Sequence, residues 1–578
     1  MYLRKKYKPS DSELRSNNKQ LPIDMSKKKI FIILPIVLSC VIFTLAFNSD
    51  KHNFQLSQQL SIFNRVVKDL NLFYVDSIQP RKMITAGINS MLESLDPYTV
   101  YYPEDESDEL KMMITGKYAG IGSMIRFHTD KKMTVIAEPY DNLPAAKAGL
   151  KIGDAIAKIN GTDVRGMGTD SVSHLLRGEP GTIVKLEIER PGTKKPFLVE
   201  IERESIAMPP ITYQGILRDS IGYILLESFT EECSKEMRRA IINLKGEGAK
   251  AFIIDLRGNG GGSLTESVNI VNLFVPKGKT IVTTKGKRKQ ADSTYKTTRE
   301  PIDTESPLII LVDGQTASAA EIVSGALQDL DRAVIIGTRT FGKGLVQSTR
   351  NLPGNGYLKL TTAKYYIPSG RCVQALDYSH RNEEGVAQRI PDSLTNVFYT
   401  EAGREVRDGG GIRPDVEPKN EKLTTLLFYL LQDMAIFDYA TQYYIEHDTI
   451  ATADIFEISD EDYKEFKKYL ISTGFNYDMQ SSKILAKLKD MIEFEGYSEI
   501  TKEEIASLEK KLQHNLEYDL DHFSKDVRTL LNNEIIMRYY GQKGEITYNL
   551  RKDTDLNECY KIFANRKRYD TILHPTQK

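Results

Sequence analysis

The stretch LIILVDGQTASAAEIVSGALQDLDRA occupies residues 308–333 and decides the fold class of the central part of the chain. It opens with an apolar run typical of a buried strand, and this run ends at Asp313-Gly314. The residues that follow predict a helix beginning near Ser318. A buried strand that passes through a short turn into a helix is typical of an α/β layer.

The same alternation continues on the N-terminal side of this stretch. IGYILLESF (221–229) and KAFIIDL (250–256) predict strands, and EECSKEMRRAIINLKG (231–246) between them predicts a helix. We therefore expect an α/β core over residues 206–418.

The flanking regions have other patterns. Residues 48–115 contain Phe63, Val67 and Leu70 at helical spacing and predict a helical N-terminal region. Residues 116–205 contain short β-rich runs between Gly and Pro turns. Residues 419–578 are charged and poor in glycine, which predicts an all-helical C-terminal domain. The expected fold is multidomain α+β.

Composition excludes several classes of protein. The chain has 578 residues, with 78 Lys and Arg against 79 Asp and Glu, so a nucleic-acid-binding protein with a large basic surface is not supported. Its four cysteines have no CxxC spacing, and its eight histidines form no HExxH. We expect no metal, no cofactor and no nucleic-acid partner.

One apolar segment, IFIILPIVLSCVIFTLAF (30–47), has no charged residue and is about the minimum length for a membrane span. Residues 1–29 hold nine Lys and Arg against three acids, a net charge of +6, which leaves −7 for the rest of the chain. The positive-inside rule then predicts a cytoplasmic basic tail (1–29) and a signal anchor (30–47), with the later domains on the periplasmic side of a bacterial inner membrane. The alternative is a cleaved signal peptide, which would give a soluble periplasmic protein. Such a signal sequence would begin at Met25, which could be the true start.

KYAGIGSMIRF (117–127) places Gly120, Ile121 and Gly122 before a strand. Glycines in such a loop let backbone N–H groups converge on an anion, which is how a peptide's terminal carboxylate is bound beside a strand edge. With the tight turns that follow, residues 116–205 resemble a PDZ domain of the bacterial protease type. The resemblance implies an extended C-terminal peptide as ligand and Gly120, Ile121 and Gly122 as the carboxylate loop.

Three further stretches carry candidate chemistry. AFIIDLRGNGGGS (251–263) predicts a glycine turn that exposes backbone N–H groups. Such a turn is either a binding site for an oxyanion or a phosphate, or simply a flexible turn. It does not match the GxxxxGK[ST] motif of nucleotide-binding proteins. Ser318 at a helix N-terminus is either a nucleophile favoured by the helix dipole or a simple N-cap. In GTRTFGKGLVQS (337–348), Lys343 lies between two glycines, an unusual place for an ordinary surface lysine.

Together these stretches resemble the C-terminal processing, or tail-specific, peptidases, a serine–lysine protease family with an embedded PDZ domain. The resemblance covers about residues 54–418, from LDPY (95–98) to GGIRPD (410–415). It implies a crotonase-like (ClpP/crotonase type) core and assigns Ser318 as nucleophile, Lys343 as general base and Gln347 as the residue that orients the lysine. The amides of Ala319 and of Gly261 or Gly262 would form the oxyanion hole. Where many members carry a second serine, this chain has Ala320, and the glycine turn lacks the proline that often follows asparagine.

A lysine base works only when neutral, and its ordinary pKa is about 10.4. We therefore expect a desolvated Lys343 with no close carboxylate partner, an acyl-enzyme mechanism, and Glu321 and Asp329 as structural organisers. The PDZ module would gate the site, with Arg177 as a candidate relay. A non-proteolytic crotonase-like enzyme and a PDZ scaffold that has lost catalysis are the rival functions. The C-terminal helices could bind another copy of the chain or an adaptor.

Overall fold

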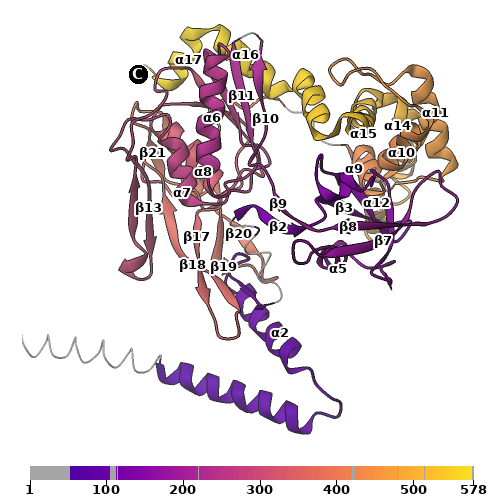
Figure 1. The fold of residues 1–578 in the computed structure, drawn as a ribbon, viewed down its shortest axis with the longest axis horizontal. Helices are drawn as coiled ribbons and strands as arrows, with labels where there is room; N and C mark the ends of the chain where they lie inside the picture. The colour runs from indigo at the N-terminus through magenta and orange to yellow at the C-terminus, as the bar shows by residue number, and fades with distance from the viewer. Residues whose placement is uncertain are drawn as a thin grey trace, which may run out of the picture. The chain divides into compact units, whose positions relative to one another are not determined.

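The computed structural model describes residues 53–104, 112, 115–218, 220–419, 424–477, 480–512 and 515–575. It divides into two compact units, residues 1–90 and 91–578. Residues 53–73 form a helix in the first unit, and α2 (Pro80–Glu93) begins there (Figure 1). The predicted membrane segment 30–47 lies outside the described residues. Within the ranges given above, no helix is both long and apolar enough to cross a membrane.

The centre of the second unit is a five-stranded sheet in the order β10-β11-β12-β15-β16. The pair β10-β11 is antiparallel and the other three pairs are parallel. Its strands are β10 (Ile211–Leu217), β11 (Ile221–Leu226), β12 (Ala251–Asp255), β15 (Leu308–Val312) and β16 (Val334–Gly337). The alternation of strands and helices predicted for this region is confirmed.

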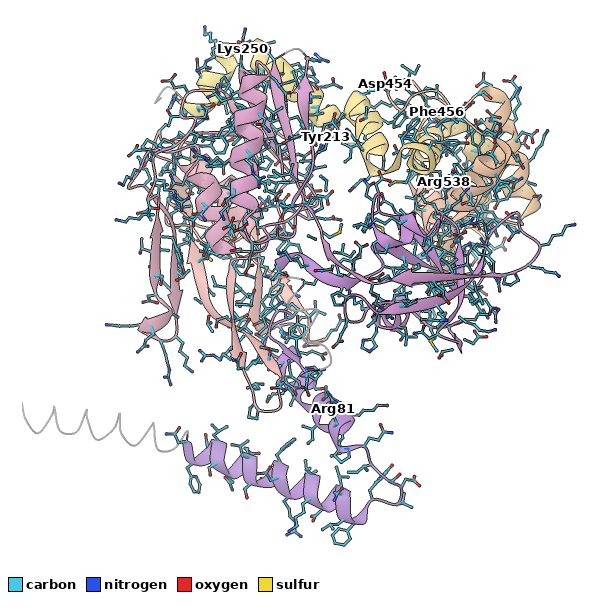
Figure 2. The ribbon with its side chains drawn as sticks, in the orientation of Figure 1. Arg81, Tyr213, Lys250, Asp454, Phe456 and Arg538 are labelled. Carbon is cyan, nitrogen blue, oxygen red and sulfur yellow. The ribbon has the colours of Figure 1, made fainter. Side chains whose placement is uncertain are left out.

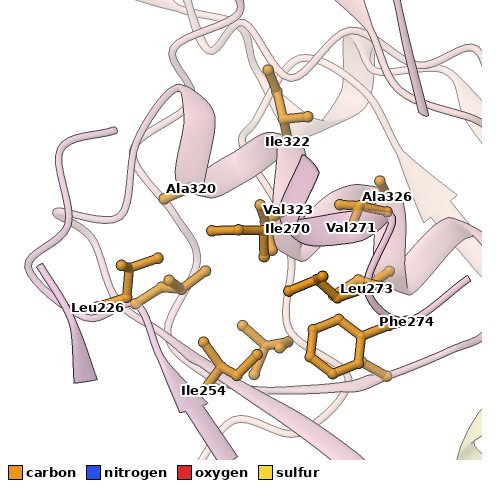
Figure 3. Close-up of a cluster of buried hydrophobic side chains, with 14 of the residues drawn as sticks. Leu226, Ile254, Ile270, Val271, Leu273, Phe274, Ala320, Ile322, Val323 and Ala326 are labelled. Carbon is orange, nitrogen blue, oxygen red and sulfur yellow. The ribbon is translucent and has the colours of Figure 1, made fainter. Parts of the chain in front are cut away.

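Three helices pack on one face of this sheet: α6 (Cys233–Gly246), α7 (Leu264–Val271) and α8 (Ala319–Asp329). Figure 3 shows the apolar core between them, in which Leu226 and Ile254 of the sheet lie below Ile270 and Val323 of the helices. Since side chains alternate along a strand, the neighbouring residues point to the opposite face. That core fixes the start of α8, where Ser318 lies.

The opposite face is covered by the end of the chain, α16 (Thr554–Ala564) and α17 (Arg566–Leu573) (Figure 1). Cys559 and Ile562 pack there against Ile309 and Ile336. Charges reinforce the contact, because the Arg257 guanidinium contacts Asp255, Asp553 and Asp555 at 2.5, 2.6 and 3.1 Å.

A second five-stranded sheet has the order β1-β18-β13-β14, with β17 also paired to β18. Its strands are β1 (Val100–Tyr102), β13 (Thr280–Gly286), β14 (Ser293–Lys296), β17 (Leu345–Asn351) and β18 (Tyr357–Tyr366). Within the region 48–115 that was predicted to be helical overall, residues 100–102 form a strand. There, antiparallel pairing with β18 overrides the local pattern, with Val100 opposite Lys359.

The region 116–205 is β-rich, as expected. One sheet has the order β3-β4-β5-β7-β8, with β6 on β5, and a separate pair, β2-β9, joins the entry and exit of the region. The elements are β2 (Lys117–Gly120), β3 (Ser123–His128), β4 (Met133–Pro139), α4 (Pro144–Lys147), β5 (Ala155–Ile159), β6 (Thr162–Asp163), α5 (Thr169–Leu176), β7 (Ile183–Glu189), β8 (Phe197–Glu202) and β9 (Glu204–Ala207).

The last part of the chain is helical, as expected. Its helices are α9 (Thr425–Gln432), α10 (Ala435–Glu446), α11 (Asp460–Ser472), α12 (Gln480–Phe494), α13 (Lys502–Lys511), α14 (Leu516–His522) and α15 (Ser524–Lys552), followed by α16 and α17. A short 3₁₀ helix, η2 (Lys289–Ala291), lies between β13 and β14. The short elements between the core sheets and the C-terminal helices are β19 (Leu376–Arg381), β20 (Ala387–Arg389), η3 (Asp392–Leu394), β21 (Val397–Tyr399) and β22 (Glu405–Arg407).

The helical region also packs against the β-rich region. Met434 and Phe437 lie in an apolar cluster with residues of β4 and β5. The buried His128 ring contacts Asp438 at 2.8 Å. Arg538, labelled in Figure 2, donates to the Phe437 carbonyl at 2.7 Å and fixes the helix that makes these contacts.

Candidate active site

Ser318 is the residue before the first turn of α8 and has a strained backbone, with φ +56° and ψ −114°. A positive φ is uncommon for a residue with a Cβ and is retained where the surrounding structure enforces it. Two contacts enforce it here. The Tyr365 hydroxyl donates to the Ser318 carbonyl at 3.1 Å, and the Ser318 N–H donates to Glu321 at 2.9 Å.

The glycine turn lies directly against this serine. The buried Asn259 accepts the Ala317 N–H on its carbonyl at 2.9 Å and donates from its side chain to Leu226 at 2.7 Å. A Cβ on Gly261 would lie 2.8 Å from the Ser318 Cβ and 2.9 Å from the Ala319 nitrogen, so no other residue fits. Glycine here is thus a requirement of close approach to the serine.

The amides around Ser318 differ in their partners. The Gly261 N–H already donates to the Asn259 Oδ1 at 2.8 Å. Gly262 forms a parallel bridge with Phe229 in which its own N–H points away from Phe229. Across the described residues, the N–H groups of Gly262 and Ala319 have no acceptor, and Ala319 is at the first position of α8, where none is available within the helix.

Glu321 connects the serine to the loop that carries Lys343. Its carboxylate is fully buried, and one oxygen accepts the N–H groups of both Ser318 and Lys343, at 2.9 and 2.8 Å. The other oxygen accepts the Thr340 hydroxyl at 2.5 Å and the Gly342 N–H at 2.8 Å. Burial raises the pKa of Glu321, while these four donors lower it. Glu321 therefore organises the loop, as the sequence predicted, without reaching the Lys343 amine through an ion pair.

Burial, and after it the positive charge of Lys359, lowers the pKa of Lys343 to about 8, against the attraction of Asp96 and Glu321. Among the described residues the Lys343 amine forms no ion pair. It lies 4.2 Å from the centre of the Tyr98 ring. A lysine in this setting is partly neutral near physiological pH, which a general base requires.

Gln347 lies on β17, four residues after Lys343. Its side-chain amide donates to the Thr361 hydroxyl at 3.1 Å, and no hydrogen bond joins it to Lys343 in the part of the chain that the structure describes. Its predicted role in orienting the lysine stays a prediction.

A cavity of about 840 Å³ brings these groups together. Ser318, Ala319, Lys343 and Gln347 all line it, as do Gly261 and Gly262. Apolar side chains form much of the remaining wall: Met112, Met208, Leu264, Ile322, Leu345 and Val346. Ser318, Lys343, Gln347 and the glycine turn therefore line one shared cavity.

Gly120, Ile121 and Gly122 line a separate pocket of about 170 Å³ between α5 and β3. A Cβ on Gly122, which has φ +69°, would lie 2.6 Å from the Leu143 Cβ. Arg177 lines both this pocket and the larger cavity, and its guanidinium lies 5.8 Å from the Tyr118 ring centre. The sequence-predicted relay residue thus lies between the two sites.

Comparison with known proteins shows the family to which the chain belongs. Over 388 residues, the chain is 35% identical to the carboxy-terminal-processing protease of Bartonella bacilliformis. The aligned residues cover 66% of this chain and 88% of that protein. This chain belongs to the carboxy-terminal processing proteases. It is also 33% identical over 347 residues to the carboxy-terminal processing protease CtpA of Bacillus subtilis strain 168, covering 60% of this chain and 72% of that one.

Family models match three parts of the chain. Residues 220–379 match peptidase family S41, residues 135–190 match a PDZ domain, and residues 426–563 match the "probable PDZ-protease, C-terminal helical domain". Among solved structures, a photosystem II D1 C-terminal processing protease is 26% identical, with 62% of this chain and 87% of that chain covered and a TM-score of 0.35. The protein is a serine protease with a PDZ domain, an S41 core and a C-terminal helical domain.

Sequence reasoning missed some residues around this protease site. Asp96 and Tyr98 were identified only as part of the motif LDPY (95–98), which resembles the family, and no role was predicted for them. In the structure both lie near the Lys343 amine. Lys359 carried no signal, and Tyr365 was noticed only within TTAKYYIPSGR (361–371), a stretch similar to the family, because the positions of both depend on how β18 pairs with its neighbours. No cluster of metal-binding side chains occurs within the described ranges.

Proposed function

We propose that the protein cleaves peptide bonds with a Ser318–Lys343 dyad on a crotonase-like core. The observation that carries the proposal is that one Glu321 oxygen binds the N–H groups of both residues, so the nucleophile and base belong to one rigid unit. The lowered pKa of Lys343, about 8, supports its role as base.

In the first step, the neutral Lys343 amine takes the proton of the Ser318 hydroxyl as its oxygen attacks the scissile carbonyl. The N–H groups of Ala319 and Gly262 stabilise the oxyanion, since the Gly261 N–H already has an acceptor. Lys343 then protonates the leaving amine, and the acyl-enzyme remains. Water attacks this ester with Lys343 again as base, which releases the new C-terminus and restores the enzyme.

The PDZ domain is proposed to select substrates by their C-termini. In the described structure, the N–H groups of Ile121 and Gly122 have no acceptor and border the 170 Å³ pocket, as a carboxylate site requires. Arg177, at the border of both cavities, would couple tail binding to the protease site. Following the charge pattern of residues 1–47, we propose that the substrates are proteins of the bacterial envelope.

The test uses the full-length protein, wild type and Ser318→Ala, with an unfolded protein that ends in apolar residues. Cleavage by the wild type alone, and much weaker cleavage when the substrate's C-terminus is amidated, supports the proposal. Equal cleavage by both enzymes, or none by either, overturns it. Arg177→Ala should slow the free-acid substrate to the rate of the amidated one, and an unchanged rate would remove Arg177 from the mechanism.

A further inference from the structure

The segment Asp96–Thr99 precedes the PDZ domain in sequence but lies beside Lys343, the proposed general base of the protease core. The buried Asp96 closes it into a turn, because its Oδ1 accepts the N–H groups of Tyr98 and Thr99, each at 2.8 Å. β1 follows directly and pairs with β18 of the core. The turn at Asp96 therefore holds the backbone of Tyr98 on its N-terminal side, and the pairing of β1 with β18 holds it on its C-terminal side.

The Tyr98 ring faces the Lys343 amine, with 4.2 Å between the nitrogen and the ring centre. The ring is itself held by Tyr378, whose hydroxyl donates to the Tyr98 hydroxyl at 3.3 Å. The two rings meet edge to face, 6.0 Å apart. The side chain that covers the lysine is thus locked rather than free to rotate.

An aromatic ring over a lysine has two opposed effects. Its π-face attracts the ammonium and favours the charged form by about 0.5–2 kcal/mol. Its bulk excludes water and disfavours the charged form, by up to several pKa units for a buried lysine. Burial is the largest influence on the pKa of Lys343 and lowers it, so we infer that exclusion of water is the larger effect of the ring.

The other charged groups around the amine do not reverse that outcome. Lys359 of β18 disfavours the protonated form, while Asp96 and Glu321 favour it. The same Asp96 oxygen that fixes Tyr98 also accepts the Thr361 hydroxyl at 3.2 Å, and Thr361 accepts the Gln347 amide. The Asp96 carboxylate therefore positions both Tyr98, which lies over the Lys343 amine, and Thr361, which binds the Gln347 side chain.

We propose that Tyr98 is a positioning residue for the Ser–Lys reaction, closing the Lys343 site to water, and that Asp96 holds it there. The inference rests on the proposed function, since it assigns a role toward the proposed base. It makes the segment before the PDZ domain a part of the protease site.

The test compares full-length wild type, Tyr98→Ala and Tyr98→Phe, with Tyr101→Ala of β1 as matched control. In Tyr98→Ala, water reaches the amine, so the acid limb of kcat/KM against pH should move upward by about 1–2 units. Near pH 7 the value should fall about 10- to 100-fold, mainly through kcat, and recover toward pH 10. Tyr98→Phe keeps the ring and should stay within about 3-fold of wild type. Tyr101→Ala should keep the wild-type limb.

A second measurement needs no turnover. In a Ser318→Ala background, the pH dependence of Lys343 acetylation by acetic anhydride, read by mass spectrometry, reports the pKa of the amine directly. An upward shift on adding Tyr98→Ala supports the inference, and an unshifted value overturns it, provided the thermal unfolding of the variant remains cooperative. Should Tyr98→Ala fail to fold, Tyr98→Ser, which likewise removes the bulk over the amine, takes its place. Activity remaining in Ser318→Ala would overturn the proposed function, which is a different outcome from an unshifted limb.

Discussion

The Glu321 carboxylate accepts the backbone N–H of Lys343 at 2.8 Å, on the same oxygen that accepts the N–H of Ser318. A helix residue three positions beyond the proposed nucleophile thereby sets the location of the proposed base. Its contact with Ser318 is also one half of a capping box for α8, so helix start and active site share one side chain.

Replacing Glu321 by Gln should inactivate the protease even though Ser318 and Lys343 are both retained. Four donors face this side chain, and an amide can accept only on its oxygen, so its NH₂ must face N–H groups. We expect a loss of about 1–3 kcal/mol in unfolding free energy and at least about a 10-fold fall in kcat. Glu266→Gln is the control, since Glu266 accepts the Ser234 N–H at the start of another helix. Equal activity of the two variants would contradict this role for Glu321.

The activity should rise with pH through the neutral range. The pKa of Lys343 is about 8, so the amine is mostly protonated and inactive below that pH. We expect kcat/KM to increase about tenfold per pH unit up to about pH 8 and then to level. A titration with a short peptide substrate between pH 5.5 and 10 measures this limb. A profile that is flat below pH 7.5 would exclude Lys343 as the base.

Lys343→Met should inactivate the enzyme yet make it more stable at pH 7. In the folded state the pKa of Lys343 lies below the unfolded value of 10.5, so burying the charged form costs free energy at every pH below about 8. Removing the amine should add about 1–3 kcal/mol to the unfolding free energy. The gain should shrink as pH rises from 8 to 10.5, where the wild-type amine becomes neutral in both states. Lys364→Met, at an exposed site on β18, should change stability by less than about 0.5 kcal/mol in denaturant titrations.

Ser318 variants should separate strain from chemistry. Both Ser318→Ala and Ser318→Gly lose the nucleophile, but only glycine adopts φ +56° without steric cost. The glycine variant should therefore be more stable than the alanine variant by about 1 kcal/mol, seen as a higher Tm. Equal melting temperatures would show that the turn at Ser318 stores no strain.

Alanine at Gly122 should damage the PDZ loop more than alanine at Gly149. Both glycines have positive φ, +69° and +79°, so the backbone cost is similar. Only at Gly122 would the new Cβ meet a neighbour, Leu143, at 2.6 Å, whereas Gly149 has open space. Binding of a peptide with a free C-terminus, measured by fluorescence anisotropy, should weaken at least about 10-fold for Gly122→Ala and little for Gly149→Ala. Similar losses in both would point to backbone strain alone.

Much of the core could be predicted from sequence, because buried strands, glycine turns and helix starts have local signals. The strand before Asp313, the turn at Gly261 and the helix after Ser318 all follow from such patterns. Contacts between distant segments have no local signal. Tyr98 faces Lys343 only because β1 pairs with β18, a pairing that the sequence pattern of residues 100–102 does not show.

The same limit applies to the finer parts of the site. The sequence left Gly261 and Gly262 as alternatives for the oxyanion hole, and the difference between them lies in the Asn259 side chain, which accepts one of the two N–H groups. It also left the role of the C-terminal helices open. Their packing on both the central sheet and the PDZ domain depends on tertiary structure, such as the apolar cluster that Ile562 shares with Ile309 and the contact of His128 with Asp438.

The pairing of β1 with β18 also orders events during synthesis. Residues 96–102 leave the ribosome before the whole PDZ domain, while their partners in β18 follow only after Ser318 and Lys343. Because non-local contacts form late and slowly, the lysine stays hydrated in any nascent chain that ends before β18. A growing polypeptide of this protease therefore carries the proposed nucleophile and the proposed base before they can act together, and becomes able to cut proteins only once its core has closed.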